Sequence, residues 1–139
     1  MRYHALSALV IAVMMTLAGC QTAKEPYAAS PDPVAPVMYP QVAAEGRLGD
    51  YLLFSKPSVR HGDPAHGVPM KVTVPLRLKD DKPVNAQYRF IFLDANGVSV
   101  GEPMDWRFMV LPPRLQVFME GAATDSRAID WRLEIRPAK

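Results

Sequence analysis

The fold is decided by the stretch Gln87-Tyr88-Arg89-Phe90-Ile91-Phe92-Leu93, which is followed at once by the turn Asp94-Ala95-Asn96-Gly97. Aromatic and β-branched residues dominate the stretch, and both of its faces are largely apolar. This composition is typical of a central strand. Asn96-Gly97 is a strong short-range hairpin signal. We therefore predict a central strand over 87–93 that turns back, with a return strand beginning over 98–100.

Further short strands are predicted on both sides of this hairpin. In residues 71–79 and 129–136 apolar and polar side chains alternate, which indicates strands with one buried and one solvated face. Pro75 lies in the outward phase and lacks an N–H, so we predict that 71–79 is an edge strand or carries a bulge there. A turn is predicted over 121–126. The other predicted strands are Tyr51 to Phe54, Trp106 to Leu111 and Leu115 to Glu120.

Together these features predict an all-β fold. Six or seven short strands separated by turn signals are typical of an antiparallel β-sandwich with Ig-like or transthyretin-like topology. No stretch after the N-terminal region has the 3.6-residue periodicity of an amphipathic helix. We assign the sandwich to residues 47–139.

The N-terminal region predicts a lipoprotein signal peptide over residues 1–19. Arg2 precedes an uncharged apolar run from Ala5 to Ala18, which is too short to span a membrane. The run ends in Leu17-Ala18-Gly19-Cys20, which resembles the lipobox at which bacterial lipoproteins are cut and acylated on cysteine. Two or more acyl chains would hold the protein stably on a membrane. Gln21 in place of Asp indicates, by resemblance to enterobacterial sorting, the outer membrane facing the periplasm.

Residues 20–46 are predicted to be the lipidated cysteine and a proline-rich tether. Prolines recur at Pro26, Pro31, Pro33, Pro36 and Pro40, and large apolar side chains are scarce. This composition is typical of an extended, polyproline-like linker. Residues 37–42 are apolar enough to add an edge strand to the domain that follows.

Charge and cysteine content exclude several classes of function. Of the 16 basic residues only Arg2 falls within 1–19, so 15 remain against 14 acidic ones. This balance gives no reason to expect a nucleic acid partner. Cys20 is the only cysteine, so acylation would leave neither a disulfide nor a thiol nucleophile.

A family resemblance is carried by Tyr88-Arg89-Phe90, Phe92, Asp94-Ala95-Asn96-Gly97, Trp106, Ala122-Ala123 and Ile129-Asp130-Trp131-Arg132-Leu133. In these segments the chain resembles the YcfL-like family of small bacterial lipoproteins. The resemblance covers roughly residues 48–136. Trp131 replaces the commoner Phe or Tyr, and Lys79-Asp80-Asp81 stands where an Asn is often found. The resemblance implies a periplasm-facing β-sandwich lipoprotein of unassigned function, and it carries over no catalytic residue.

One loop contains three potential metal ligands, His61, Asp63 and His66. They could hold a metal ion if the loop curled around it. A Gly- and Pro-rich surface loop seldom supplies the supported geometry of a metal site, so we expect a solvated connection and assign no metal ligand.

Four arginines could form a cationic face if their strands are neighbours: Arg89, Arg107, Arg132 and Arg136. Such a face could bind an anionic glycan or an acidic protein surface. Outward arginines also keep a sandwich soluble and protect its edges, and Arg89 is expected to pack its guanidinium against neighbouring side chains.

No catalytic motif is evident, so we expect neither an enzyme nor a cofactor. The chain lacks a Gly-x-Ser-x-Gly elbow and a phosphate-binding loop. Asp94 and Asp105 are expected near hairpin turns and not in a pocket, so they are not assigned as a pair of carboxylates for general acid–base catalysis. The predicted function is a non-enzymatic interaction module anchored through Cys20, which docks a periplasmic protein or an envelope polymer. The alternative is a structural lipoprotein of a larger envelope or secretion assembly.

Overall fold

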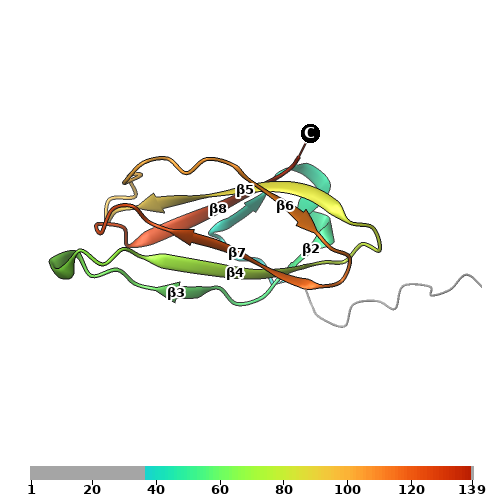
Figure 1. The fold of residues 1–139 in the computed structure, drawn as a ribbon, viewed down its shortest axis with the longest axis horizontal. Helices are drawn as coiled ribbons and strands as arrows, with labels where there is room; N and C mark the ends of the chain where they lie inside the picture. The colour runs from blue at the N-terminus through green and yellow to red at the C-terminus, as the bar shows by residue number, and fades with distance from the viewer. Residues whose placement is uncertain (1–36, 139) are drawn as a thin grey trace, which may run out of the picture. The chain divides into compact units, whose positions relative to one another are not determined.

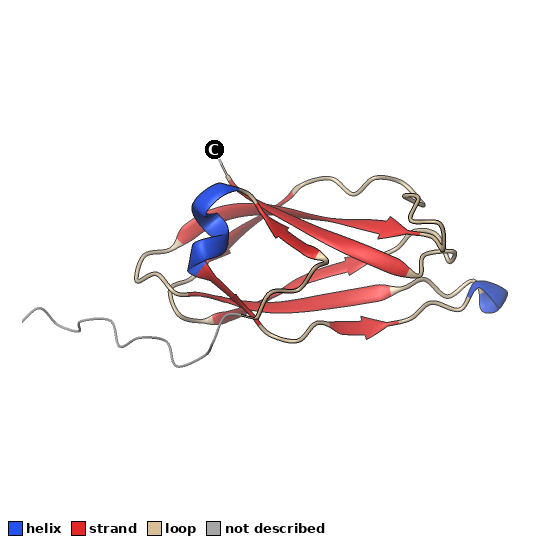
Figure 2. Cartoon of the chain, turned by 180° about the vertical axis from the view of Figure 1, so that it is seen from behind, coloured by secondary structure: helices blue, strands red, loops and turns tan. Residues whose placement is uncertain are grey.

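A computed structural model describes residues 37–138, which form eight strands and two short 3-10 helices (Figure 1). The helices, η1 (Gly46–Tyr51) and η2 (Pro64–His66), lie at opposite ends of the sandwich (Figure 2). The strands are β1 (Val42–Ala44), β2 (Leu52–Phe54), β3 (Ser58–Arg60), β4 (Lys71–Leu78), β5 (Val84–Leu93), β6 (Arg107–Leu111), β7 (Gln116–Ala122) and β8 (Asp130–Pro137).

The strands form two facing sheets, which confirms the predicted all-β sandwich. The first sheet has the order β1-β8-β5-β6, so β5 is a central strand as predicted. In the second sheet β7 pairs along one side of β4, and β2 and β3 share the other side. The short β1 runs parallel to β8, whereas the remaining strand pairs are antiparallel.

The core lies between the sheets and is built from the inward positions of β4, β5 and β8. Phe90 is its centre: the ring stacks against Phe92, meets Tyr88 edge-on and tilts against Trp131, with centroids 6.0–6.2 Å apart. Val72, Val74, Leu76 and Leu78 of β4 are buried alternately, and Leu133 and Ile135 of β8 likewise. The period-two alternation in the sequence therefore identified the buried faces correctly.

β4 has partners on both sides and a continuous register with β7 through Pro75, so it is neither an edge strand nor bulged at that residue, and the prediction is wrong. The carbonyl of Pro75 accepts a hydrogen bond from the Ser55 N–H at 2.9 Å, on the side of β2 and β3. Because the N and C=O of a residue in an antiparallel strand point to the same side, the missing N–H also faces that side. On that side Pro75 lies opposite the segment between β2 and β3, which forms no strand ladder with β4, so no hydrogen bond from an N–H at position 75 is lost. The ladder to β7 is undisturbed.

The return segment 98–100 and Gly121 also differ from the prediction. The turn over 94–97 is confirmed: Gly97 has φ 76° and its N–H bonds to the Asp94 carbonyl at 3.0 Å. The return segment 98–100 forms only an isolated bridge, Leu93 with Ser99. The partner of β5 on that side is β6, further along the chain. Gly121, predicted to begin a turn, lies inside β7.

The sheet takes in residues that precede position 47. Val42–Ala44 form β1, which pairs with Leu133–Ile135 of β8. Hydrogen bonds of 2.8 Å from Glu45 N to Ile135 O and from Leu133 N to Gln41 O flank this pairing. The predicted signal peptide, Cys20 and the first part of the tether lie outside the described residues.

Candidate functional site

The outer face of the β1-β8-β5-β6 sheet carries one indole flanked by two guanidinium groups. Trp106 immediately precedes β6 and lies over the outward side of β5 and β8. The guanidinium carbon of Arg136 is 3.9 Å from the Trp106 ring centroid, and that of Arg89 is 4.6 Å away. Both distances are within the range of cation–π attraction. We call Arg89, Trp106 and Arg136 the Trp106 cluster.

Each arginine of the Trp106 cluster is held by the residue directly opposite it on the neighbouring strand. Arg89 Nε donates to Glu134 Oε2 at 2.7 Å, and Arg136 Nε donates to Gln87 Oε1 at 3.0 Å. Cross-strand pairs of this kind are the unit of side-chain stabilisation on a sheet face. Arg89 and Glu134 are each about one-third exposed, so their ion pair adds roughly 0.2–1 kcal/mol. Its main effect is to orient the guanidinium.

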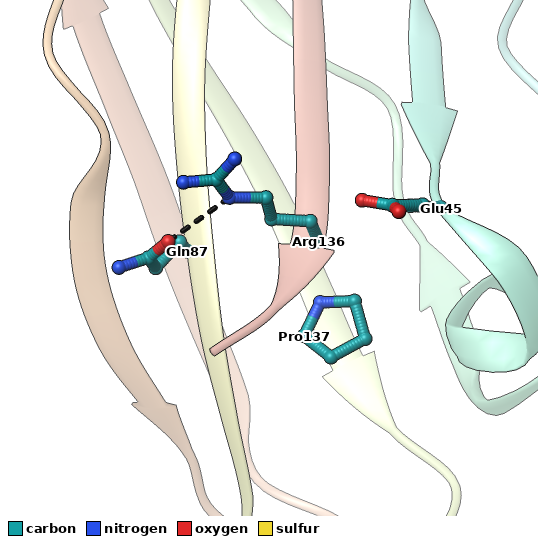
Figure 3. A pocket seen from close by; sticks show the side chains of 4 residues that line it. All are labelled: Glu45, Gln87, Arg136 and Pro137. Atoms are coloured by element: carbon teal, nitrogen blue, oxygen red, sulfur yellow. Dashed lines mark hydrogen bonds between the residues drawn. The ribbon is translucent and has the colours of Figure 1, made fainter. Parts of the chain in front are cut away.

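Arg136 also lines two adjoining hollows. The larger, of about 480 Å³, is bordered by Glu45, Gln87, Arg136 and Pro137 (Figure 3). The smaller, of about 270 Å³, lies against Trp106 and Glu134. Glu45 follows β1, and its main-chain bond to β8 places it beside the larger hollow. The surface therefore offers a cation, an amide, a carboxylate and an aromatic ring, which together can bind a polar partner.

Of the four arginines expected on a cationic face, three share it and one does not. Arg89, Arg132 and Arg136 occupy outward positions of β5 and β8. Arg107 pairs with the inward-facing Tyr88, and its Nη1 donates to the Glu120 carbonyl of β7 at 3.2 Å. A shift of one residue along a strand reverses the face, so Arg107 links the two sheets instead. Among the described residues, neither Arg132 nor Arg136 has an acidic partner in an ion pair.

Arg127 lies outside this cationic face because it is committed to a turn. Its guanidinium forms an ion pair with Asp125 at 2.6 Å. The side-chain hydrogen bond from Arg127, followed by its main-chain hydrogen bond, lowers the pKa of Asp125 from 3.8 to about 2. The stabilisation from this pair is complete above the ordinary pKa of the carboxyl and is lost as the pH falls through about 2. At neutral pH Arg127 therefore stays paired with Asp125 and adds no cation to this face.

The loop with His61, Asp63 and His66 is organised by its own hydrogen bonds. Asp63 caps η2: its Oδ1 accepts from the Ala65 N–H at 3.0 Å, and its Oδ2 lies 2.6 Å from His66 Nδ1. Over residues 37–138 no three His, Cys, Asp or Glu side chains form a group that could hold a metal ion. Asp63 therefore has a structural role in this turn.

Sequence reasoning missed most of the site. The sequence places Trp106 in a strand and in the family resemblance but in no binding site, and it does not single out Gln87, Glu134 or Glu45. The available signal was the outward phase shared by Gln87 and Arg89 on one strand and by Glu134 and Arg136 on the other. It could be used only once β5 and β8 were known to be neighbours. As expected, Asp94 stabilises the turn in which it lies: its Oδ1 accepts hydrogen bonds from the main-chain N–H groups of Asn96 and Val98.

The predicted lipidation residue, Cys20, lies outside the described residues. Within 37–138, no helix has both the length and the apolar character required to cross a bilayer.

A family model described as "Protein of unknown function (DUF1425)" matches residues 42–137. Two solved structures are similar in fold. The Campylobacter jejuni protein cj0090 aligns with a TM-score of 0.59 and 23% identity over 70% of this chain and 98% of its own. A DUF1425 member from Shewanella sp. pv-4 aligns with a TM-score of 0.54 and 19% identity over 63% and 79% of the two chains. No curated protein matches the sequence.

Proposed function

Since this chain belongs to the DUF1425 family of proteins of unknown function, we propose that it is a lipid-anchored, non-enzymatic interaction module of the bacterial cell envelope. Acylated Cys20 would hold it on the outer membrane, facing the periplasm. The tether would let the sandwich reach its partner. The resemblance to YcfL-like lipoproteins supports the anchor.

The observation that carries the proposal is the Trp106 cluster with its adjoining hollows. Trp and Arg are the residue types most enriched among the energetic centres of protein interfaces. The two guanidinium groups are held by Glu134 and Gln87, so little side-chain entropy remains to be lost on binding. Arginines held in this way therefore bind a partner more favourably than exposed arginines that move freely.

Charge indicates the chemistry of the partner. Arg132 and Arg136 have no acidic partner among residues 37–138, whereas Arg89 is balanced by Glu134. An acidic segment of a periplasmic protein would supply carboxylates to these two arginines, and guanidinium groups bind carboxylates in a bidentate manner. The proposed partner is therefore a protein with an acidic docking segment.

The anchor is tested by metabolic labelling with palmitate. We expect the wild-type chain to incorporate label and to sediment with outer membranes. Cys20→Ala should lose the label and enter the soluble periplasmic fraction, because no acyl chain then holds it. An unlabelled wild-type chain, or a Cys20→Ala variant that stays on the membrane, would refute the anchor.

Docking is tested by crosslinking in whole cells followed by quantitative mass spectrometry. The double variant Arg132→Glu and Arg136→Glu should recover its crosslinked protein partner at about one-tenth of the wild-type level, equivalent to about 1.4 kcal/mol. The double variant Lys56→Glu and Arg60→Glu is the matched control: it makes the same charge change at exposed positions on and just before β3 of the other sheet and should leave recovery unchanged.

Three outcomes would contradict docking of an acidic protein segment through this face. Equal losses in both variants would show that the Trp106 face is not involved. Binding of the purified chain to peptidoglycan sacculi, lost in the double variant, would identify an envelope polymer as the ligand. Stable recovery of a multi-subunit secretion complex that is insensitive to the double variant would favour a structural role.

A further inference from the structure

The free edge of β6 presents main-chain groups and apolar side chains together. Among the described residues β6 pairs with β5 alone, so its other side has no strand partner. Phe108 and Val110 point outward from the sheet and are 59% and 50% exposed. Exposed apolar side chains at alternate positions of an edge strand are unusual, because edges are ordinarily protected by charge, proline or bulges.

The register shows which main-chain groups of β6 are free. The Asn85 carbonyl bonds to the Ala138 N–H on the β8 side at 3.0 Å. Main-chain groups alternate in direction along an antiparallel strand, so those of Ala86 point to β6 and to Met109, which lies opposite. The N–H and C=O groups of Phe108 and Val110 therefore point away from β5, to the free edge.

The adjacent edge of the second sheet, on β7, is less apolar and partly occupied. By the same alternation, Glu120 of β7 directs its main-chain groups away from β4, and its carbonyl already accepts a hydrogen bond from Arg107. On the first sheet, the opposite edge is the three-residue β1. Of these edges, β6 alone has two large exposed apolar side chains at positions with free main-chain groups, Phe108 and Val110, whereas β7 has one, Phe118.

We propose that β6 pairs antiparallel with β6 of a second copy of this chain, which joins the two four-stranded sheets into one continuous sheet. A two-fold axis at Met109 places Phe108 opposite Val110 of the partner subunit and the reverse. Each such pair can exchange both of its N–H···O bonds. The two apolar side chains then cover each other on the outer face.

Several features favour a second copy as the occupant. The edge is self-complementary, since the same two residues supply both halves of a two-fold contact. In this register Arg107 faces Leu111 of the partner subunit, so no like charges oppose each other across it. Pro112 and Pro113 follow β6 and limit slippage. Because the other edge of the sheet is the short β1, pairing stops at a dimer and does not extend into a fibre.

The size of the contact sets its strength. A five-residue strand pair covers less than the roughly 1,200–2,000 Å² of stable protein complexes. The dimer is therefore weak and forms in a concentration-dependent manner. None of the three residues of the Trp106 cluster takes part in the pairing, although Phe108 lies opposite Gln87, the residue that holds Arg136.

The pairing is tested by disulfide trapping of the full chain in cell membranes. In the Met109→Cys variant the two introduced cysteines meet across the axis, so mild oxidation should give a disulfide-linked dimer, several-fold more than in Leu115→Cys. Leu115 is 63% exposed and so more open to chance collision than the half-buried Met109, but it lies outside β6. The wild-type chain measures any crosslinking through Cys20.

A second substitution then separates strand pairing from proximity. Adding Val110→Lys to Met109→Cys places a charge on the free edge without touching the ladder to β5, and should abolish the trapped dimer. Adding Leu115→Lys should leave it unchanged. Sedimentation of the full chain in detergent should show a concentration-dependent dimer that Val110→Lys removes. Equal trapping at positions 109 and 115, or a dimer that survives Val110→Lys, would overturn the proposal.

Discussion

Replacing Phe90 by Ala should lower the free energy of unfolding by about 3–5 kcal/mol, the range for deleting a buried aromatic side chain. Phe90 is 1% exposed and contacts three other rings, so its removal leaves a cavity that those rings cannot close without leaving their own positions. Guanidinium unfolding followed by tryptophan fluorescence measures the loss, because Trp131 packs against Phe90.

Phe118→Ala is the matched control for this measurement. Phe118 also lies in a strand but is 52% exposed on the outer face of the second sheet. Its truncation should change the free energy of unfolding by no more than about 0.5 kcal/mol. Similar losses from the two substitutions would show that Phe90 is not the centre of the core.

Gly121→Val should destabilise the fold by about 1–3 kcal/mol through overpacking. A Cβ atom at Gly121 would lie 2.5 Å from Cδ2 and 2.6 Å from Cγ of Phe90. Phe90 is enclosed on its other sides and cannot move away. Ala122→Val, one position along β7 and facing solvent, should have little effect in the same unfolding assay.

Substitutions at positions 90 and 121 should be energetically coupled, because both act on the contact between Phe90 and Gly121. In a Phe90→Leu background the smaller side chain leaves room for a Cβ at position 121, so Gly121→Ala should cost less than it does in the wild-type chain. A double-mutant cycle should give a coupling free energy of about 0.5–3 kcal/mol. Strict additivity would show that the predicted clash is relieved elsewhere.

Gly121 also illustrates what the sequence could not reveal. A glycine after an alternating strand is a turn signal, so the sequence predicts a turn that begins at Gly121. In the structure its function is steric, since β7 approaches β5 of the other sheet at this residue. Only the packing of the two sheets against each other brings Gly121 and Phe90 together. Local patterns carry no such information.

The same limit applies to Pro75 and to the Trp106 cluster. The alternation in β4 and β8 correctly gave the buried residues, because it depends only on each strand itself. The edge prediction for β4 failed because the fit of Pro75 depends on the gap between two neighbouring strands. The alternation within β5 and β8 also predicts that Arg89 and Arg136 point outward. The indole between them, however, belongs to Trp106 in the segment before β6, and the path of that segment is set by tertiary contacts.

The parallel pairing of β1 with β8 has a mechanical consequence. If Cys20 is anchored as proposed, tension between membrane and partner reaches the sandwich through β1, a three-residue strand. It should detach well before the longer β5 and β8. Releasing residues 42–51 would extend the linker by roughly 30 Å, at about 3.3 Å per residue. It would also withdraw Glu45 from beside Arg136, so that stretching the linker alters the charge of the docking surface.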